Sequence, residues 1–315
     1  MDQNYSHKSF RFPVFFDDDL HPAGSAFLAL EDQGFQLGLA VFETLLVQAG
    51  HAYFLEAHVE RLEQGAGAIG ISWVGQGVLR AAVNRYVRAI EALPAAPPSY
   101  ALRITYSSGV PGGDARWGLS ARELAPLPEQ GAQLWLSSMR VIGDDLTGLK
   151  ATSRLRHVMA RREALAQGCY DALLLNTEDE LAEGTISNVF LYKDGVLSTP
   201  PLAAGCLGGI MRQHLLADLQ REAPQIGGGR FLALACEPLR LEQLRQADEV
   251  FLSNSTGRLI PICRILGAAS EPQSLPGGAG ALVARLSDRI AALEERDRLR
   301  GQDGYTGEPV ELPRT

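Results

Sequence analysis

The sequence predicts a mixed α+β protein in two domains, and three observations lead to this expectation. The chain has 315 residues, of which 46% are apolar, enough to bury one or two cores. Runs of β-rich sequence alternate with amphipathic helical patterns along most of its length. The segment 121–133 contains two prolines and little periodicity, which is typical of a connection between domains. We therefore expect one domain up to about residue 122 and another beyond it.

The first part of the chain predicts a hairpin, two helices and a strand. Two β-rich runs in residues 34–55 flank a turn at Gln48-Ala49-Gly50-His51. A helix should follow, because Val59, Leu62 and Ala66 recur at helical spacing, with His58, Arg61 and Gly65 on a neighbouring stripe. A second amphipathic helix is expected over 77–93, followed by a strand over 99–108.

The second part begins with an expected strand at 134–142 and a helix that Lys150 shortly precedes. In that helix the residues at helical spacing are Leu155, Val158, Met159, Arg162 and Leu165, with Gly168 as the C-cap. Strands follow at 170–176 and 186–200, the latter folded at Asp194-Gly195. A helix should start near residue 208, a helix and a strand should lie in 240–262, and a last helix should span 278–300.

Composition and motif spacing argue against several classes of function. The formal charge of −8 and the lack of a long basic run argue against nucleic acid as a partner. The N-terminus lacks the pattern of a signal peptide, and no run reaches about 20 apolar residues, so we expect a cytoplasmic protein with no membrane partner. The four cysteines and six histidines have no metal-ligand spacing, so we expect no metal site.

Five features do indicate chemistry, and together they suggest a cofactor with a phosphate and a ring. They are Arg61 on a helix, Lys150 at a strand-to-helix junction, Glu183 in a turn, "GGIMR" opening a helix at Gly208, and "SNST" after a strand. A dinucleotide fingerprint and a GxSxG elbow are both missing from the sequence.

Seven blocks in order resemble the fold-type IV pyridoxal-phosphate enzymes. This group holds the branched-chain and D-amino-acid aminotransferases and 4-amino-4-deoxychorismate lyase, to which the chain is most similar. The resemblance covers roughly residues 30–265, and the blocks are "GFQLGLAVFETLLV", "HVERL", "GLKATSRL", "AEGTISNVF", "STP", "LGGIMRQ" and "ADEVFLSNSTGRLIPI".

The resemblance implies a two-domain architecture with the cofactor in the cleft. With the boundary expected from the composition of the chain, 1–122 is the smaller α/β domain with an N-terminal extension and 123–133 is the linker. The larger pyridoxal-phosphate-binding domain, built on a β-barrel-like core, is then 134–300, and the composition of 301–315 predicts a flexible tail. The resemblance also implies a homodimer in which loops of one subunit reach the site of the other.

The resemblance assigns the covalent and ring contacts of the cofactor to two residues. Lys150 matches the lysine that holds pyridoxal phosphate as a Schiff base and later transfers protons. Glu183 matches the carboxylate that keeps the pyridine nitrogen protonated. Thr185, Ser187 and Asn188 either orient Glu183 and the ring or satisfy the backbone of the turn.

The phosphate contacts come from three places in the resemblance. Arg61 matches the phosphate-binding arginine. The backbone amides of Ile210 and Met211 match the donors at the start of a helix, and Ser255 and Thr256 match a second set of donors.

Two reactions remain open, along with a cofactor-holding protein that does not turn over. A lyase would form 4-aminobenzoate and pyruvate from 4-amino-4-deoxychorismate, and a transaminase would exchange an amino group between an amino acid and a 2-oxo acid. "GLKATSRL", "GIMRQ" and "LSNS" favour the lyase, whereas Ser108 stands where many lyases carry an arginine. Arg116 is a candidate ligand for the substrate carboxylate, and Arg154 is a second candidate that could equally form a salt bridge on the helix surface.

Overall fold

The computed structural model describes residues 12–16, 18–25, 28–128, 130–226, 230–267, 270–274 and 280–302. The chain divides into two compact units. One contains residues 1–125 and 149–153, and the other contains residues 126–148 and 154–315. Each unit combines helices with β-sheet, so the predicted mixed α+β fold is confirmed.

The first unit is a sheet with three helices among its described residues. The helices are α1 (Gln33–Leu37), α2 (Leu55–Ala68) and α3 (Gln76–Glu91). The six described strands pair in the order β2-β1-β6-β5-β3-β4. Their bounds are β1 Val14–Phe16, β2 Asp19–His21, β3 Ala40–Gln48, β4 His51–Ala52, β5 Ser99–Ser107 and β6 Arg116–Arg122.

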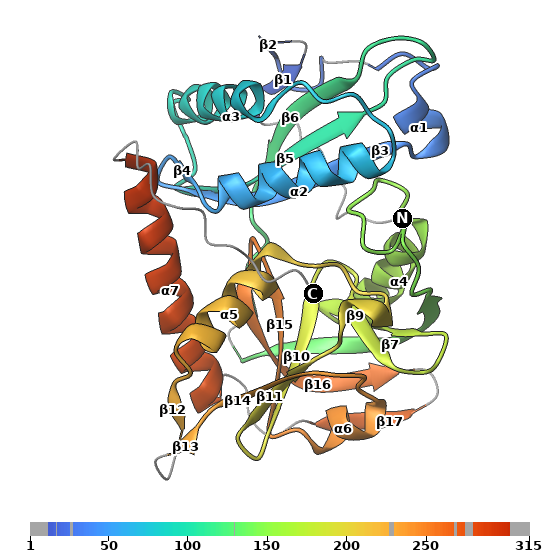
Figure 1. Ribbon diagram of the computed structural model, residues 1–315, viewed down its shortest axis with the longest axis vertical. Coiled ribbons are helices and arrows are strands. Elements are labelled where there is room, and N and C mark those ends of the chain that lie inside the picture. Colours follow the sequence, from blue (N-terminus) through green and yellow to red (C-terminus); the bar gives the residue numbers. More distant parts are fainter. Residues whose placement is uncertain are drawn as a thin grey trace. The chain divides into compact units, whose positions relative to one another are not determined.

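The predicted hairpin and helices of this unit are confirmed. Strands β3 and β4 pair antiparallel through the turn at Ala49-Gly50, where both residues have positive φ. Helix α2 buries Val59, Leu62 and Ala66, the three residues whose spacing predicted it. Helices α2 and α3 share one apolar core with β3 and β5 (Figure 1).

The segment 149–153 belongs to the first unit, although it follows the beginning of the second along the chain. Lys150 O accepts a hydrogen bond from Phe42 N at 2.9 Å, and Thr152 N donates to Ala40 O at 2.8 Å. Ala151 forms an antiparallel bridge with Val41. The compact units therefore place Lys150 beside β3, whereas the linear boundaries expected from sequence assign it to the domain at 134–300.

The second unit is built on a curled sheet of nine described strands in the order β14-β11-β10-β15-β16-β7-β8-β9, with β17 beside β16 (Figure 1). Strands β12 and β13 form a separate pair. The strand bounds are β7 Ala132–Val141, β8 Asp171–Asn176, β9 Leu181–Gly184, β10 Asn188–Lys193, β11 Val196–Thr199, β12 Gln225–Ile226, β13 Arg230–Phe231, β14 Ala233–Cys236, β15 Glu249–Asn254, β16 Arg258–Gly267 and β17 Ser270–Ser274. The helices are α4 Leu155–Ala166, η3 Leu202–Ala204, α5 Ile210–Arg221, α6 Leu241–Gln246 and α7 Ala281–Gln302.

Apolar runs and a tight turn explain the centre of this sheet. Strand β8 is buried at every position, and β10 and β15 are buried along most of their length. The predicted hairpin at Asp194-Gly195 is confirmed, because β10 and β11 pair antiparallel and both turn residues have positive φ.

Helix α4 lies where the sequence predicts it but buries a different face. Its buried residues are Ala160 and Ala164, which pack with the core around β8. The larger apolar residues of the predicted stripe are exposed, and they are Leu155, Val158, Met159 and Leu165. Because alanine side chains are short, the alanine face of α4 can pack close to the sheet. The larger apolar side chains of the predicted stripe then face away from the sheet.

The ends of the chain are described only in part. Helix α7 runs to Gln302, two residues beyond the expected end at 300. Residues 303–315 of the expected tail, residues 278–279 of the expected helix and residues 1–11 of the N-terminal extension lie outside the described residues. Within the described ranges, every helix is too short or too polar to cross a bilayer.

Candidate active site

Lys150 lies beside an aromatic ring that also carries an arginine. Its Nζ atom is 4.8 Å from the centroid of the Phe42 ring, and the guanidinium carbon of Arg103 on β5 is 3.8 Å from the same centroid. Arg103 Nε also donates to Thr105 Oγ1 at 3.1 Å. The ring of Phe42 therefore has two cationic groups around it, and Arg103 is a residue that the sequence did not single out.

Arg61 is held by a buried carboxylate rather than lying on a solvated helix surface. Its Nε and Nη2 atoms donate to the two oxygens of Glu43 on β3, each at 2.7 Å. His58, one turn earlier on α2, contacts Glu43 Oε2 through Nδ1 at 2.6 Å. Glu43 and His58 are both 0% exposed, so two of the three residues of this triad are buried away from solvent.

The charges of this triad follow from burial and from its neighbours. Burial alone would raise the pKa of Glu43, but Arg61 and His58 reverse this and hold the pKa far below its ordinary value. Burial lowers the pKa of His58, and the positive charges of Arg61 and Lys150 lower it further against the opposing effect of Glu43. His58 is therefore neutral at neutral pH and donates its Nδ1 proton to Glu43. Its Nε2 atom is buried without a hydrogen-bond partner among the described residues.

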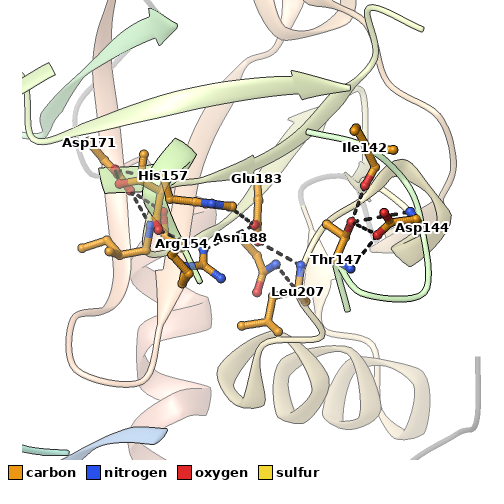
Figure 2. A network of polar contacts seen from close by, with 12 residues as sticks. Ile142, Asp144, Thr147, Arg154, His157, Asp171, Glu183, Asn188 and Leu207 are labelled. Atoms are coloured by element: carbon orange, nitrogen blue, oxygen red, sulfur yellow. Dashed lines mark hydrogen bonds and ion pairs between the residues drawn. The ribbon is translucent and has the colours of Figure 1, made fainter. Parts of the chain in front are cut away.

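Glu183 on β9 is the centre of a second buried cluster, shown in Figure 2. Its Oε1 atom is 2.9 Å from His157 Nε2, and its Oε2 atom accepts a hydrogen bond from Leu207 N at 2.9 Å. Arg154 Nη2 lies 3.6 Å from Oε1 and donates to Thr185 O at 3.2 Å. Burial alone would raise the pKa of Glu183, but the His157 hydrogen bond, the Arg154 charge and the Leu207 N–H together hold it below its ordinary value.

The turn after Glu183 is organised by Asp171, the first residue of β8. The carboxylate of Asp171 is fully buried and accepts hydrogen bonds from the hydroxyl groups of Thr185 and Ser187. It also accepts from the backbone N–H groups of Ala172, Thr185 and Ile186. The hydroxyl groups of Thr185 and Ser187 therefore bind Asp171, and it is the carboxylate of Asp171 that satisfies the backbone N–H groups of the turn.

Asn188 connects this turn to the start of α5. Its Nδ2 atom donates to Leu207 O at 2.7 Å, and Leu207 is also the residue whose N–H binds Glu183. A Cβ atom at Gly209 would overlap Asn188 Oδ1, so a larger residue there would require the Asn188 side chain to move. The structure therefore brings Glu183, Asn188 and the loop before Ile210 together within the second unit.

The N-terminus of α5 has the properties of an anion site. Its N-cap, Gly209, provides no side-chain hydrogen bond to the first turn. The first N–H groups of a helix, here those of Ile210, Met211 and Arg212, have no partner within the helix, and the helix dipole adds partial positive charge. This donor set fits a phosphate, and Glu183 as an ionised buried carboxylate fits a protonated ring nitrogen. A phosphate and a protonated ring nitrogen are both groups of pyridoxal phosphate, the cofactor that the sequence predicts.

Ser255 and Thr256 lie in the turn that joins β15 to β16. Asn254 Oδ1 accepts from Thr256 N at 3.1 Å, from Thr256 Oγ1 at 3.2 Å and from Gly257 N at 2.6 Å. The donors of Thr256 are thus engaged within the turn, and a phosphate would have to compete with Asn254 for them.

The two candidate ligands of a substrate carboxylate lie in different surroundings. Arg116 is the first residue of β6, and its guanidinium lies 5.1 Å from the Phe16 ring centroid. Arg154 is the N-cap of α4 and lies beside Glu183 and Thr185, so it is not part of a salt bridge on the outer helix surface. Ser108, where an arginine was expected, donates through Oγ to Gln33 Oε1 at 3.2 Å.

Sequence reasoning missed Glu43, His58, His157, Asp171 and Arg103. Glu43 had a usable signal, because it is the only charged residue in the strand "AVFETLLVQ". A charge within such a strand requires a buried partner. Arg103 and Asp171 had the same signal, because each is the only charged residue of its strand, β5 and β8. His58 and His157 lie on helices and had no comparable signal.

Comparisons with known proteins identify the family of the chain. The family described as amino-transferase class IV matches residues 40–265. A probable branched-chain-amino-acid aminotransferase of Thermotoga maritima is 34% identical over 139 residues, which cover 44% of this chain and about half, 47%, of that relative. An aminodeoxychorismate lyase of Vibrio harveyi is 27% identical over 276 residues, 83% of this chain and 94% of the relative. The crystal structure of 4-amino-4-deoxychorismate lyase from Pseudomonas aeruginosa superposes with a TM-score of 0.71 at 29% identity, covering 93% of this chain and 100% of that one.

Proposed function

Because the chain belongs to the class IV aminotransferase family, and is therefore a pyridoxal-phosphate-dependent enzyme, we propose that it is a lyase. Its substrate is 4-amino-4-deoxychorismate, and its products are 4-aminobenzoate and pyruvate. The observation that carries this choice is the extent of the likeness to lyases. The lyase structure is 29% identical and is matched over its whole length, whereas the aminotransferases that are matched over more than nine-tenths of their length are 21–25% identical.

Lys150 carries the covalent link to the cofactor in this proposal. The sequence contains three lysines, Lys8, Lys150 and Lys193, which restricts the choice. Lys193 is half exposed, and its hydrogen bond with Asp248 raises its pKa, which makes it a poor nucleophile. Lys150 lies beside Phe42 on the segment that pairs with β3, so its backbone is fixed by hydrogen bonds.

The cofactor, once bound, supplies an electron sink for the carbon that loses a proton. Glu183 holds the positive charge of the ring nitrogen, because its pKa is low and it stays ionised. Arg61, oriented by Glu43, and the first N–H groups of α5 bind the phosphate. Ser255 and Thr256 contribute further donors, and for Thr256 the phosphate replaces Asn254 as the acceptor.

The amine of Lys150 removes the proton from the carbon of the substrate that bears the amino group. Breaking the ether bond then releases the three-carbon side chain as pyruvate, and the remaining ring becomes aromatic 4-aminobenzoate. The carboxylates of the substrate need cations near Lys150. Arg103 beside Phe42 is a candidate from the structure, and Arg116 and Arg154 remain candidates from the sequence.

The alternative is a class IV aminotransferase of the branched-chain or D-amino-acid type. It is favoured by the 34% identity to the Thermotoga maritima relative and by Ser108 in place of an arginine. In that case Lys150 would move a proton between Cα of an amino acid and the cofactor.

One experiment separates the two reactions. The purified enzyme with pyridoxal phosphate is incubated with 4-amino-4-deoxychorismate, and 4-aminobenzoate and pyruvate are measured by chromatography. In parallel, its absorption spectrum is followed with a panel of D- and L-amino acids in the absence of a 2-oxo acid. A lyase forms both products in equal amounts. Stoichiometric spectral conversion by an amino acid with no 4-aminobenzoate would assign the chain to the aminotransferases instead.

A second experiment locates the covalent link. Borohydride reduction of the loaded enzyme followed by peptide mass spectrometry should place the adduct on Lys150. Lys150→Ala should abolish the adduct and lower turnover by roughly 10³-fold or more, whereas Lys193→Ala should retain both. An adduct on Lys8 or Lys193 would overturn the assignment.

We also propose that the enzyme works as a homodimer. Support comes from the exposed apolar stripe of α4, since an exposed cluster of large apolar side chains is typical of an interaction surface. Sedimentation velocity should show a dimer for the natural chain. Leu165→Arg should weaken this dimer, and an unchanged dimer would exclude α4 from the interface.

A further inference from the structure

His157 is the side chain that contacts Glu183 at hydrogen-bond distance, through Nε2 at 2.9 Å. Leu207 N binds the other carboxylate oxygen, and the two donors reach Glu183 from different elements, α4 and the loop before α5 (Figure 2). A carboxylate with one donor on each oxygen cannot rotate about its last bond without losing a contact. Its remaining lone pairs are therefore fixed in direction.

Helix α4 brings His157 to this position through its alanines. His157 lies one turn before Ala160 and Arg161 and two turns before Ala164, so these residues share one helix face. Ala160 and Ala164 are completely buried against the core, and Arg161 binds Asp171 on β8 at 3.3 Å. The first turn is thus held close to the sheet, where His157 can reach β9.

The direction of the proton in this contact follows from the charge of Glu183. Because Glu183 is ionised, both of its oxygens are acceptors, so His157 must donate through Nε2–H. Arg154 does not replace this donor, since it lies 3.6 Å from Oε1 and directs its hydrogen bond to Thr185 O. An ionised buried carboxylate that lost one of two donors would be poorly compensated.

We propose that His157 is a positioning residue that aims Glu183 at the ring nitrogen of the cofactor and keeps it ionised for that contact. The inference rests on the proposed role of Glu183 and extends it to a residue outside the cofactor's own contacts. If it is correct, replacing His157 weakens the binding of a cofactor that has the ring nitrogen and leaves the binding of one without it nearly unchanged.

The test compares two ligands that differ in one ring atom. Affinities of the apoprotein are measured for pyridoxal phosphate and for its analogue with C–H in place of the ring nitrogen. His157→Leu should weaken the binding of pyridoxal phosphate by about tenfold, the effect of one hydrogen bond to a charged group. Binding of the analogue should change by no more than about twofold, because it offers Glu183 no N–H. His157→Gln, which keeps an N–H donor, should restore most of the affinity.

Arg156→Leu is the matched control, since it introduces the same side chain at an exposed position of the same helix. Equal weakening of both ligands by His157→Leu would mean that His157 only maintains the fold, and it would overturn the inference. Unchanged affinity for both ligands, or a His157→Gln variant as weak as His157→Leu, would overturn it as well.

A measurement on the natural chain avoids dependence on the folding of a variant. Nitrogen-15 NMR of histidine-labelled apoprotein should show the His157 Nε2 atom protonated at pH 8. A proton on Nδ1 alone would exclude the donated hydrogen bond. Failure of pyridoxal phosphate to bind at all, or an adduct away from Lys150, would instead contradict the proposed function.

Discussion

Two buried carboxylates, one in each compact unit, have similar neighbours and different contacts. Glu43 and Glu183 each lie on a strand, and each has a histidine and an arginine nearby. Glu43 is bound on both oxygens by the fork of Arg61 and also by His58. Glu183 is bound by one histidine and one backbone N–H, and its arginine remains at 3.6 Å.

This difference indicates two separate tasks for a buried acid. Glu43 is paired with a full positive charge at 2.7 Å, so its charge is compensated within the protein and its effect is to orient Arg61. Glu183 is compensated less completely, so it retains the capacity to bind a further cation such as a protonated ring nitrogen. A buried carboxylate is thus a candidate for ligand binding when its pairing within the chain is incomplete.

The largest expected effect is on the stability of the first unit. Glu43→Gln leaves Arg61 without a counter-charge, and breaking a buried pair from one side typically costs about 3–5 kcal/mol. Urea unfolding of the apoprotein should show this loss, while Glu60→Gln, an exposed change on α2, should stay within about 0.5 kcal/mol. A Glu43→Gln variant as stable as the natural chain would contradict the view that Glu43, unlike Glu183, is fully paired within the protein.

Glu183→Gln should reverse the pattern and affect turnover more than stability. The amide keeps the shape of the side chain but stabilises a protonated ring poorly, and removing such an electrostatic contact costs about 10²–10³-fold in rate. Steady-state assays should show this drop with the cofactor still bound. Glu178→Gln, an exposed change in the same region, serves as the control. Loss of the cofactor with normal turnover of the remainder would contradict the assignment.

Arg61→Lys tests the orienting role of Glu43. Lysine keeps the charge but cannot bind both oxygens of Glu43 as the guanidinium does. We expect cofactor affinity to fall by about tenfold, the effect of one lost hydrogen bond to a charged group. Arg88→Lys, an exposed change that serves as the control, should leave cofactor affinity unchanged. Equal affinities measured by titration for both variants would show that the fork geometry of Arg61 is unimportant.

The smallest expected effect is a change in the acid sensitivity of the apoprotein. The pKa of Glu43 and that of Glu183 are both lowered in the folded chain. Their stabilisation is therefore complete above the unfolded value of about 4.3 and is lost as the pH falls below it. Thermal unfolding from pH 7 to pH 3 should show the gap between the natural chain and Glu43→Gln narrowing below about pH 4. A gap that widens toward low pH would have the wrong sign for this linkage.

Local pattern was sufficient for much of the fold. The turns at Ala49-Gly50 and Asp194-Gly195, the helix that buries Val59 and Leu62, and the helix that starts at Ile210 were all predicted correctly. Each depends on residues within a few positions of one another, so the spacing of apolar and turn residues contains the necessary information. The family and its cofactor also followed from sequence, because its motifs recur in order along the chain.

The contacts that distinguish the two acids were decided only by tertiary structure. Glu43 meets His58 and Arg61 from 15 and 18 positions away, and Glu183 meets Leu207 and His157 from 24 and 26 positions away. The same holds for α4, where periodicity located the helix and packing selected its alanine face. A local pattern can state that a residue is charged or apolar. Which partner compensates that charge depends on how distant strands and helices pack, and this packing determines whether a buried acid is fully paired or can still bind a ligand.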